Sequence, residues 1–391
     1  MNDFNRNLIR AASAALGCLM LSACATAPQQ TQTAAPSSFQ FVFTSDSHFG
    51  ITRKVFRGAG NVDANVVNAA LVDELNGLPE ASIPCDEGVR ACSRVGAVDF
   101  LIDTGDLANR MEDGGPSAAA SWQQFETQYL GRLALRDAGG QAAAVYLAPG
   151  NHDVSNAIGF YKPMTLDHDA TSQVQIYNRM MHPANPGTTE NYRYATGRVN
   201  YSKDIGGVHF VFLNIWPDSV ERAWLERDLA KIGEDVPVLI FTHDPPSVEA
   251  KHFINPNGNH DINAHDKFEN LLADELADRD ARGQASVEAQ TLIEQRELAG
   301  FLKRHRNIVA YFHGHTNYNE YYTWSGPDKD VALRVFRVDS PMKGEVSAKD
   351  EKKLSFQLVS VDPRARRMTV REYLWNAHAW GDGITVSLQP R

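Results

Sequence analysis

Five short polar motifs, each directly after or within two residues of an apolar run, carry the residue types that bind metal ions. In chain order they are Asp46-Ser47-His48, Gly105-Asp106-Leu107-Ala108-Asn109, Gly150-Asn151-His152-Asp153, the single His243, and Gly314-His315-Thr316-Asn317. Carboxylates, imidazoles and an amide oxygen suit divalent ions such as Zn, Mn or Fe. Two such ions about 3.5–4 Å apart can activate a water and stabilise both oxygens of a phosphoryl displacement. The motifs therefore indicate metal-assisted hydrolysis without a protein nucleophile.

Taken singly, each of these residues has a simpler interpretation. Asp46 or Asp106 could cap a helix or occupy a turn, and His243 could be a hydrogen-bonded core histidine. Asn151 and Asn317 would by default be turn residues. The functional interpretation depends on the whole set, because every polar group follows an apolar strand. A serine-hydrolase elbow, a Walker loop and a Rossmann fingerprint are all missing from the sequence.

Short apolar runs rich in β-branched residues predict the strands that position these motifs. They cover residues 39–43, 98–102, 143–148, 208–215, 236–241 and 308–312. Helical spacing predicts helices over 63–76, from the capping pair Asp218 and Glu221 onward, and over 286–305. Strands that alternate with helices predict an α/β layered fold. Since ligands bind beyond the carboxyl ends of strands in such folds, we expect the five motifs to converge at one rim.

The rest of the chain indicates one large domain over residues 39–391. Residues 332–338, 354–361 and 367–374 are strand-like and have no helix between them, which predicts antiparallel strands completing a second sheet. Two long polar insertions, near 154–201 and 245–285, interrupt the α/β pattern, and we expect substrate choice to depend on them.

The ordered motifs resemble those of the calcineurin-like metallophosphoesterase superfamily over residues 39–317. The resemblance implies a four-layer α/β/β/α fold and two divalent ions, either Mn, Fe or Zn. Carried over by position, it implies a first metal site with Asp46, His48 and Asp106, and a second site with ligands from four residues, namely Asp106, Asn151, His243 and His315. Asp106 would bridge the two ions.

The same resemblance implies catalytic roles for the third motif. His152 would contact the phosphoryl oxygens and protonate the leaving group, with Asp153 as its orienting partner. One position departs from the family pattern, because Asn317 stands where the last histidine of the family is found. A neutral amide oxygen is a weaker ligand than imidazole, so we expect a more labile first metal.

The N-terminal residues have the layout of a signal peptide. Arg6 and Arg10 precede an apolar run over residues 11–21, which is too short to span a membrane comfortably. The run ends in Leu21-Ser22-Ala23-Cys24, which resembles the lipobox of bacterial lipoproteins. We expect residues 1–23 to be removed, Cys24 to carry a lipid anchor and residues 24–38 to form a flexible tether. An ordinary secretory signal is the alternative. Under either interpretation the protein is exported. A lipid anchor would keep it at a membrane, such as the outer membrane, on the periplasmic or cell-surface side.

The net charge and the cysteine content bear on the partners of the protein and on its disulfide bonds. The formal net charge of −10 at pH 7 argues against nucleic acid as a partner. Cys85 and Cys92 have six residues between them, and in an oxidising compartment this spacing predicts a loop disulfide, with free thiols as the alternative.

Other candidate residues have plainer explanations. His252, His260 and His265 in the second insertion are interpreted as solvated loop histidines, although they could line a substrate entrance. The aromatic cluster is interpreted as core or rim packing; it comprises Tyr311, Tyr318, Tyr321, Tyr322 and Trp324.

The sequence as a whole favours hydrolysis of a small phosphate monoester by a hydroxide that two metals activate. The first alternative is a phosphodiesterase that acts on nucleotides or phospholipid headgroups. The second is a metal-loaded binding lipoprotein without turnover. The sequence does not indicate an oligomeric state.

Overall fold

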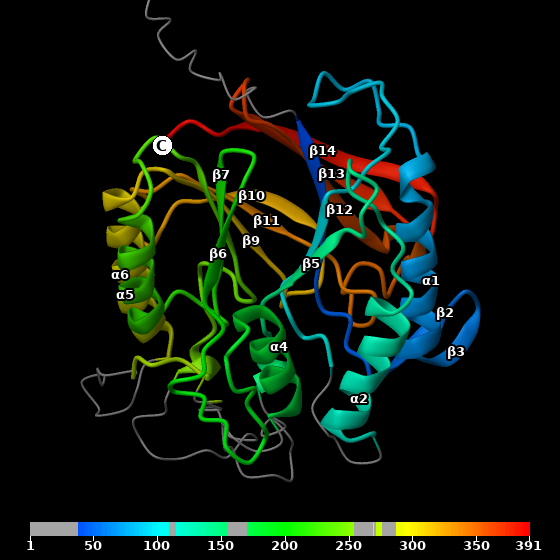
Figure 1. The fold of residues 1–391 in the computed structure, drawn as a ribbon, viewed down its shortest axis with the longest axis horizontal. Coiled ribbons are helices and arrows are strands. Elements are labelled where there is room, and N and C mark those ends of the chain that lie inside the picture. The colour runs from blue at the N-terminus through cyan, green and yellow to red at the C-terminus, as the bar shows by residue number, and fades with distance from the viewer. Residues whose placement is uncertain (1–37, 109–114, 155–169, 254–268, 270, 276–286) are drawn as a thin grey trace, which may run out of the picture. The chain divides into compact units, whose positions relative to one another are not determined.

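The strands that carry the motifs are those that the apolar runs predict. The computed structural model describes residues 38–108, 115–154, 170–253, 269, 271–275 and 287–391 (Figure 1). Residues 36–391 make up one compact unit, and the fold is that of this unit. The expected signal segment, Cys24, nearly all of the expected tether, Asn109, His260 and His265 lie outside the described residues.

The first sheet has six strands and carries the first three motifs. In order across the sheet they are β14 (Ala379–Ser387), β13 (Arg367–Leu374), β12 (Ser355–Asp362), β1 (Phe39–Thr44), β4 (Phe100–Asp103) and β5 (Ala144–Leu147). β1, β4 and β5 are parallel, whereas β12, β13 and β14 add antiparallel strands beyond β1. Asp46, Asp106 and Asn151 therefore leave the sheet at one edge.

The second sheet also has six strands and carries the last two motifs. In order they are β10 (Glu320–Trp324), β11 (Leu333–Arg337), β9 (Ile308–His313), β8 (Val238–Phe241), β7 (Val208–Phe212) and β6 (Tyr201–Ile205). The four inner strands are parallel and the two edge strands are antiparallel. His243 and His315 follow the carboxyl ends of β8 and β9.

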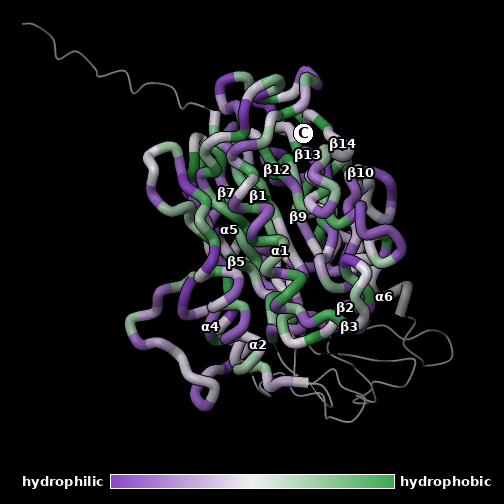
Figure 2. Tube along the Cα trace, turned by 90° about the vertical axis from the view of Figure 1, so that its right-hand side faces the viewer, coloured by the Kyte–Doolittle hydropathy of each residue, from purple (hydrophilic) through white to green (hydrophobic). Residues whose placement is uncertain are grey.

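Phenylalanine side chains fill the space between the two sheets. Phe41 and Phe43 of β1 pack against Phe210, Phe241 and Phe312 of the second sheet, with ring centroids 5.3 to 6.2 Å apart. All five are fully buried, and each such burial stabilises the fold by about 1.5–3 kcal/mol. The hydrophobic colouring follows the strands in Figure 2. This core holds the sheets face to face, so their motif-bearing edges meet.

Helices cover the outer face of each sheet, which completes the α/β/β/α layers (Figure 1). Val67 and Leu71 of α1 belong to the core cluster of the first sheet, and Leu225 of α5 and Leu298 of α6 to that of the second. The helices are α1 (Ala64–Gly77), α2 (Ala118–Gln124), α3 (Asn151–Val154), α4 (Thr171–Met181), α5 (Ser219–Leu229) and α6 (Val287–Arg304). Among the described residues, no helix combines the length and apolar character needed to cross a membrane.

Shorter elements connect the layers. They are the hairpin β2 (Thr52–Phe56) and β3 (Ala59–Asp63), the π-helix η2 (Phe125–Leu130), and the 3-10 helices η1 (Leu78–Glu80), η3 (Ala250–His252) and η4 (Glu351–Lys353). Aspartates cap the predicted helices, since Asp63 accepts a hydrogen bond from the backbone of α1 and Asp218 accepts two from α5.

The prediction for the C-terminal strands is wrong in its pairing. Residues 333–337, 355–362 and 367–374 are all strands, but they belong to different sheets. β11 joins the second sheet parallel to β9, whereas β12 and β13 extend the first sheet. The connection from β11 to β12 crosses between the sheets, and it passes the motif-bearing edge.

The disulfide between Cys85 and Cys92 is formed, as their spacing predicts. Its loop is held against β13, because Asp86 accepts hydrogen bonds from Arg371 at 2.7 and 2.8 Å. The Val89 amide also donates to the Thr369 hydroxyl at 2.7 Å. The disulfide therefore closes a surface loop that is already anchored to the first sheet.

Candidate metal centre

The loops after β1 and β4 are joined through their backbones. The Asp46 amide donates to the Gly105 carbonyl, and the His48 amide donates to the Asp106 carbonyl, both at 2.8 Å. Asp46, His48 and Asp106 have φ of 59°, 41° and 53°. A left-handed conformation is unfavourable for residues other than glycine, and such strain concentrates at functional sites. The loops thus hold three side chains in positions that the chain would not adopt unaided.

Two glycines of the motifs are required by close approach. A Cβ atom at Gly150 would lie 2.2 Å from Asp106 Oδ1 and 2.8 Å from His243 Cε1. A Cβ atom at Gly314 would lie 2.2 Å from Asp46 Oδ2. These glycines allow the loops of the two sheets to approach within contact distance.

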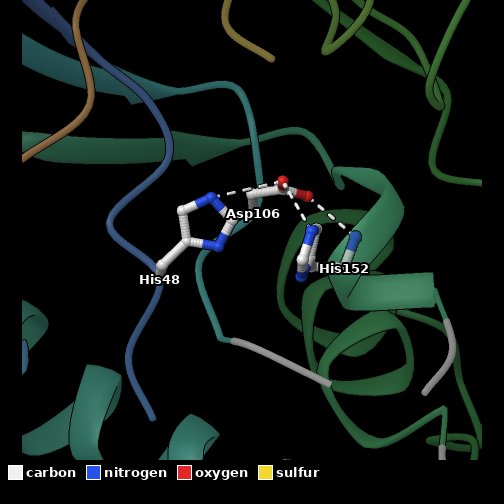
Figure 3. Close-up of side chains that lie close together, drawn as sticks. All are labelled: His48, Asp106 and His152. Carbon is white, nitrogen blue, oxygen red and sulfur yellow. Dashed lines mark hydrogen bonds and ion pairs between the residues drawn. The ribbon is translucent and has the colours of Figure 1, made fainter. Parts of the chain in front are cut away.

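The first group of candidate ligands surrounds one oxygen of Asp106. His48 Nε2 lies 3.5 Å from Asp106 Oδ2 and 3.6 Å from Asp46 Oδ1. His152 Nε2 lies 3.8 Å from the same oxygen of Asp106. Figure 3 shows the two imidazoles on either side of this carboxylate. Distances of this size between donor atoms are those of ligands that share one cation.

The second group surrounds the other oxygen of Asp106. His243 Nε2 lies 3.4 Å from Asp106 Oδ1 and 3.1 Å from Asn151 Oδ1. His315 Nδ1 lies 3.1 Å from His243 Nε2. The first sheet thus supplies Asp106 and Asn151, and the second supplies His243 and His315. Asp106 faces both groups, which is the geometry of a carboxylate that bridges two ions.

The donor atoms and their burial fit divalent cations. Asp46 Oδ1 and both ring nitrogens of His48 are buried and have no hydrogen-bond partner among the described residues. Buried polar atoms are rarely left without a partner, so these atoms are suited to a ligand. No sulfur belongs to either group, and the oxygen and nitrogen donors suit Zn, Mn or Fe.

The carboxylates of the centre stabilise positive charge. Burial opposes ionisation of Asp106, but the charges of His243 and His152 outweigh burial and hold the pKa of Asp106 well below its usual value. Burial also acts to lower the pKa of His243, yet the charge of Asp106 outweighs it and raises this pKa to about 10. A site that favours a proton so strongly meets the electrostatic requirement for a cation.

Asn317 lies two residues after His315, and one of the two polar atoms of its side chain is hydrogen-bonded. Its Nδ2 donates to the His315 carbonyl at 2.8 Å, while its Oδ1 is buried without a partner among the described residues. Its φ of 53° is again left-handed. Among the described residues, neither of these side-chain atoms is hydrogen-bonded to Asp46 or His48, so the role of Asn317 as a ligand stays a prediction.

Asp153 has hydrogen bonds that hold the loops of the centre. Its carboxylate accepts from the amides of Leu107 and Ala108, each at 3.1 Å, and from Gly150 at 2.9 Å. Burial, followed by the charge of Asp106, raises the pKa of Asp153 to about 7. Asp153 therefore fixes the loop of the second motif against that of the third, which carries His152.

His252 is buried beside the centre, so its interpretation as a solvated loop histidine is wrong. It is fully buried, it bonds to Asp244 through Nδ1, and its ring lies 5.1 Å from that of His315. The local sequence is polar and gives no sign of burial, because the burial arises from packing of η3 against α6 and of His252 against Asp244 and His315.

Two carboxylates from the second insertion contact candidate ligands from outside, and the sequence motifs did not reveal them. Glu249 Oε2 lies 3.3 Å from His315 Nε2. Glu269 accepts a hydrogen bond from Asn151 Nδ2 at 3.2 Å. In each contact the carboxylate pairs with the side-chain nitrogen that does not face His243, and such contacts orient a ligand toward its metal.

The aromatic residues in and after β9 are packing residues, as expected. Tyr311 is fully buried and Trp324 is buried at 9% exposure. Tyr318 and Tyr322 stack with the Arg337 guanidinium, and Tyr321 packs against Phe336.

Two facing sheets that gather carboxylates, imidazoles and an amide at one edge define a dinuclear metal-dependent hydrolase. Residues 39–319 match the family model described as calcineurin-like phosphoesterase. The chain therefore belongs to the calcineurin-like phosphoesterase family and is a metallophosphoesterase, which hydrolyses phosphoesters with divalent metal ions in a dinuclear site.

Three solved structures align with the chain at low sequence identity. PhoD aligns with a TM-score of 0.50 and 9% identity, covering 91% of this chain and 71% of its own. A dimetal phosphatase from Danio rerio has a TM-score of 0.47 and 11% identity, with 90% and 100% covered. A purple acid phosphatase from yellow lupin, Lupinus luteus, has a TM-score of 0.46 and 12% identity, with 90% and 54% covered. No curated protein matches the sequence.

Proposed function

We propose that the protein is an exported phosphomonoesterase whose metal ligands come from the two groups of side chains around Asp106. Asp46, His48 and Asp106 hold one ion, with Asn317 as a further ligand. The other ion is held by Asp106, Asn151, His243 and His315. The observation that carries the proposal is the position of Asp106, whose two oxygens lie 3.5 and 3.4 Å from histidines of different groups.

The residues of the chain divide the work of hydrolysis. When bound, two divalent ions supply a water of lowered pKa and polarise the phosphoryl oxygens. His152 stands beside the same Asp106 oxygen as His48 and protonates the departing alcohol. Asp153 and the strained loops keep these groups in place, which avoids reorganisation during the reaction.

Monoesters are favoured because the centre is buried. Asp46 and His48 are fully buried, and His152 is only 9% exposed. The His48 and His152 rings stand 4.7 Å apart. A phosphoryl group with one substituent fits such a site more easily than a diester with two.

The test compares two variants with the wild type. Asp106→Ala and Asn151→Ala should each abolish hydrolysis of p-nitrophenyl phosphate and reduce bound metal, because each removes a ligand of the second ion. Asn178→Ala serves as the control and should retain activity, because the Asn178 side chain on α4 hydrogen-bonds to the backbone of Gly187 in the loop that follows α4. Unchanged turnover in both ligand variants would refute the assignment.

A phosphodiesterase is the second candidate, since the same chemistry serves both ester types. Turnover of p-nitrophenyl phosphate and bis-p-nitrophenyl phosphate by one metal-loaded preparation separates the two, and a higher kcat/KM for the diester would reverse the proposal. Metal binding with no turnover of either ester would instead favour a metal-loaded binding lipoprotein.

The proposed location is a membrane outside the cytoplasm, through lipid on Cys24. The signal pattern before Cys24 supports it, and the Cys85–Cys92 disulfide is of the kind that oxidising compartments favour. Mass spectrometry of the mature N-terminus tests it: the wild type should begin at lipid-modified Cys24, and Cys24→Ser should leave the membrane fraction. A Cys24→Ser protein processed like the wild type would favour an ordinary secretory signal.

A further inference from the structure

Lys343 brings a positive charge to the side of the centre where His152 stands. Its Nζ lies 3.1 Å from His152 Nε2, and its side chain is half-buried. Lys343 falls outside the residues that match the family model, which end at 319.

The loop that carries Lys343 is tied to the first motif. The Ser340 hydroxyl donates to the Asp46 carbonyl at 2.8 Å and accepts from the Lys343 amide at 2.9 Å. One serine therefore joins the backbone of a candidate ligand to the backbone of Lys343.

Three further hydrogen bonds hold the same loop. Arg53 donates to the Pro341 carbonyl at 2.8 Å and to the Ser347 carbonyl at 2.7 Å. The Glu345 amide donates to the Asn317 carbonyl at 2.8 Å. Because four contacts fix this loop, the charge of Lys343 is held in one position, unlike the charge of a mobile surface lysine.

We propose that Lys343 binds the non-bridging oxygens of the substrate phosphoryl group and sets the preference for dianionic monoesters over monoanionic diesters. This inference rests on the proposed function of the centre. Lys343 is a substrate-binding residue that acts beside His152, and it takes no part in holding metal.

The charge of the substrate explains the preference. A phosphate monoester carries a charge of about −1.5 to −2 at pH 7, because its second pKa is about 6. A diester carries a single negative charge. Because Coulomb energy scales with the product of the charges, an ammonium at hydrogen-bond distance stabilises the monoester about twice as strongly. A charge-assisted bond to a phosphoryl oxygen adds to this difference.

The experiment uses the metal-loaded protein with Lys343→Gln and Lys343→Arg. Lys349→Gln is the matched control, because Lys349 lies six residues further along the same connection and its side chain is exposed. For each protein, bound metal, kcat/KM for p-nitrophenyl phosphate and bis-p-nitrophenyl phosphate, and the affinity for inorganic phosphate by calorimetry are measured.

Lys343→Gln should lower kcat/KM for the monoester by about 100-fold, in line with the loss of one group that stabilises transition-state charge. The diester should be affected much less, and inorganic phosphate should bind about tenfold more weakly. Lys343→Arg should recover most of both losses, while Lys349→Gln and the metal content of every variant should match the wild type.

Equal losses for both esters, or an unchanged affinity for phosphate in Lys343→Gln, would overturn the inference. Failure of the proposed function would look different, since the wild type itself would then hydrolyse neither ester. In that case the phosphate affinities of Lys343→Gln and the wild type still decide whether Lys343 binds the phosphoryl group.

Discussion

Asp106 joins the two groups of candidate ligands, and neighbouring hydrogen bonds maintain its geometry. Its φ of 53°, like those of Asp46 and His48, costs about 1–3 kcal/mol relative to an ordinary conformation. The His152 amide donates to Asp106 Oδ1 at 2.8 Å, and the Ser340 hydroxyl holds the Asp46 carbonyl. These bonds oppose relaxation of the strained loops, so the candidate ligands are already arranged for a cation.

Gly150→Ala should damage this arrangement by sterics alone. The added Cβ atom would lie 2.2 Å from Asp106 Oδ1, and neither this oxygen nor His243 can withdraw without leaving its group. A displacement of about 1 Å at a catalytic centre can cost about 100-fold in rate, and we expect a loss of that size together with weaker metal binding. Steady-state kinetics and elemental analysis measure both effects.

Gly77→Ala provides the matched control, because nothing lies within 4 Å of a Cβ atom at the end of α1. It should keep full activity and stabilise the fold by up to about 1 kcal/mol. A Gly150→Ala protein with wild-type rate and metal content would show that the close approach is not needed.

Residues of the centre were predictable from the sequence where a short motif follows a strand. Asp46 and His48 are two positions apart, so local spacing alone places both in one loop. Lys343 and Glu269 carry no such signal, because their partners lie 191 and 118 residues away in the chain. Contacts of this kind depend on how loops meet after folding, which residue patterns do not encode.

At the scale of elements, strands that are buried along their whole length were the easiest to predict from the sequence. β1, β8 and β9 are buried along their whole length, and their continuous apolar runs were recognised. β6 and β14 were missed, because they are edge strands with largely exposed or half-buried residues. An edge strand needs little apolar surface, so its sequence resembles a loop.

His209 links three elements and should make their docking depend on pH. On β7, it bonds to Asp204 of β6 at 2.7 Å and to Asp228 of α5 at 3.0 Å. Burial acts to lower its pKa, but the bonds to Asp228 and Asp204 outweigh burial and raise it. Because the folded pKa exceeds the unfolded value of about 6.5, the stabilisation is complete below that pH and fades as pH rises through the folded pKa.

His209→Gln should therefore lower the free energy of unfolding most at acidic pH. We expect a loss of about 1–2 kcal/mol at pH 5.5 and a smaller loss at pH 9, measured by urea denaturation. His378→Gln, at an exposed ion pair with Glu74, should change stability by less than about 0.5 kcal/mol at both pH values. An equal loss for His209→Gln at the two pH values would show that packing, rather than charge, holds α5.

At the scale of the whole molecule, the centre joins the two halves of the fold. The first sheet supplies Asp46, His48, Asp106 and Asn151, and the second supplies His243 and His315. The phenylalanine core holds the sheets together independently of this edge. Folding and metal binding are therefore separable, but a bound cation adds contacts that exist only when both sheets are in place.

Removal of metal should consequently lower the thermal stability of the wild type without unfolding it. At a free metal concentration 100-fold above Kd, a ligand of the folded state adds about 2.7 kcal/mol to the free energy of unfolding, and chelation should remove this amount. Differential scanning fluorimetry with and without EDTA gives the shift in Tm.

Asp106→Asn is the control, because it removes the proposed shared ligand and also a buried negative charge. Its Tm should be insensitive to EDTA and should not exceed that of the metal-free wild type, since the charges of His243 and His152 stabilise the Asp106 carboxylate and the amide loses this stabilisation. An EDTA shift of the same size in Asp106→Asn would mean that the stabilising ion lies elsewhere in the molecule. No shift in the wild type would mean that metal binding does not help to hold the two sheets together.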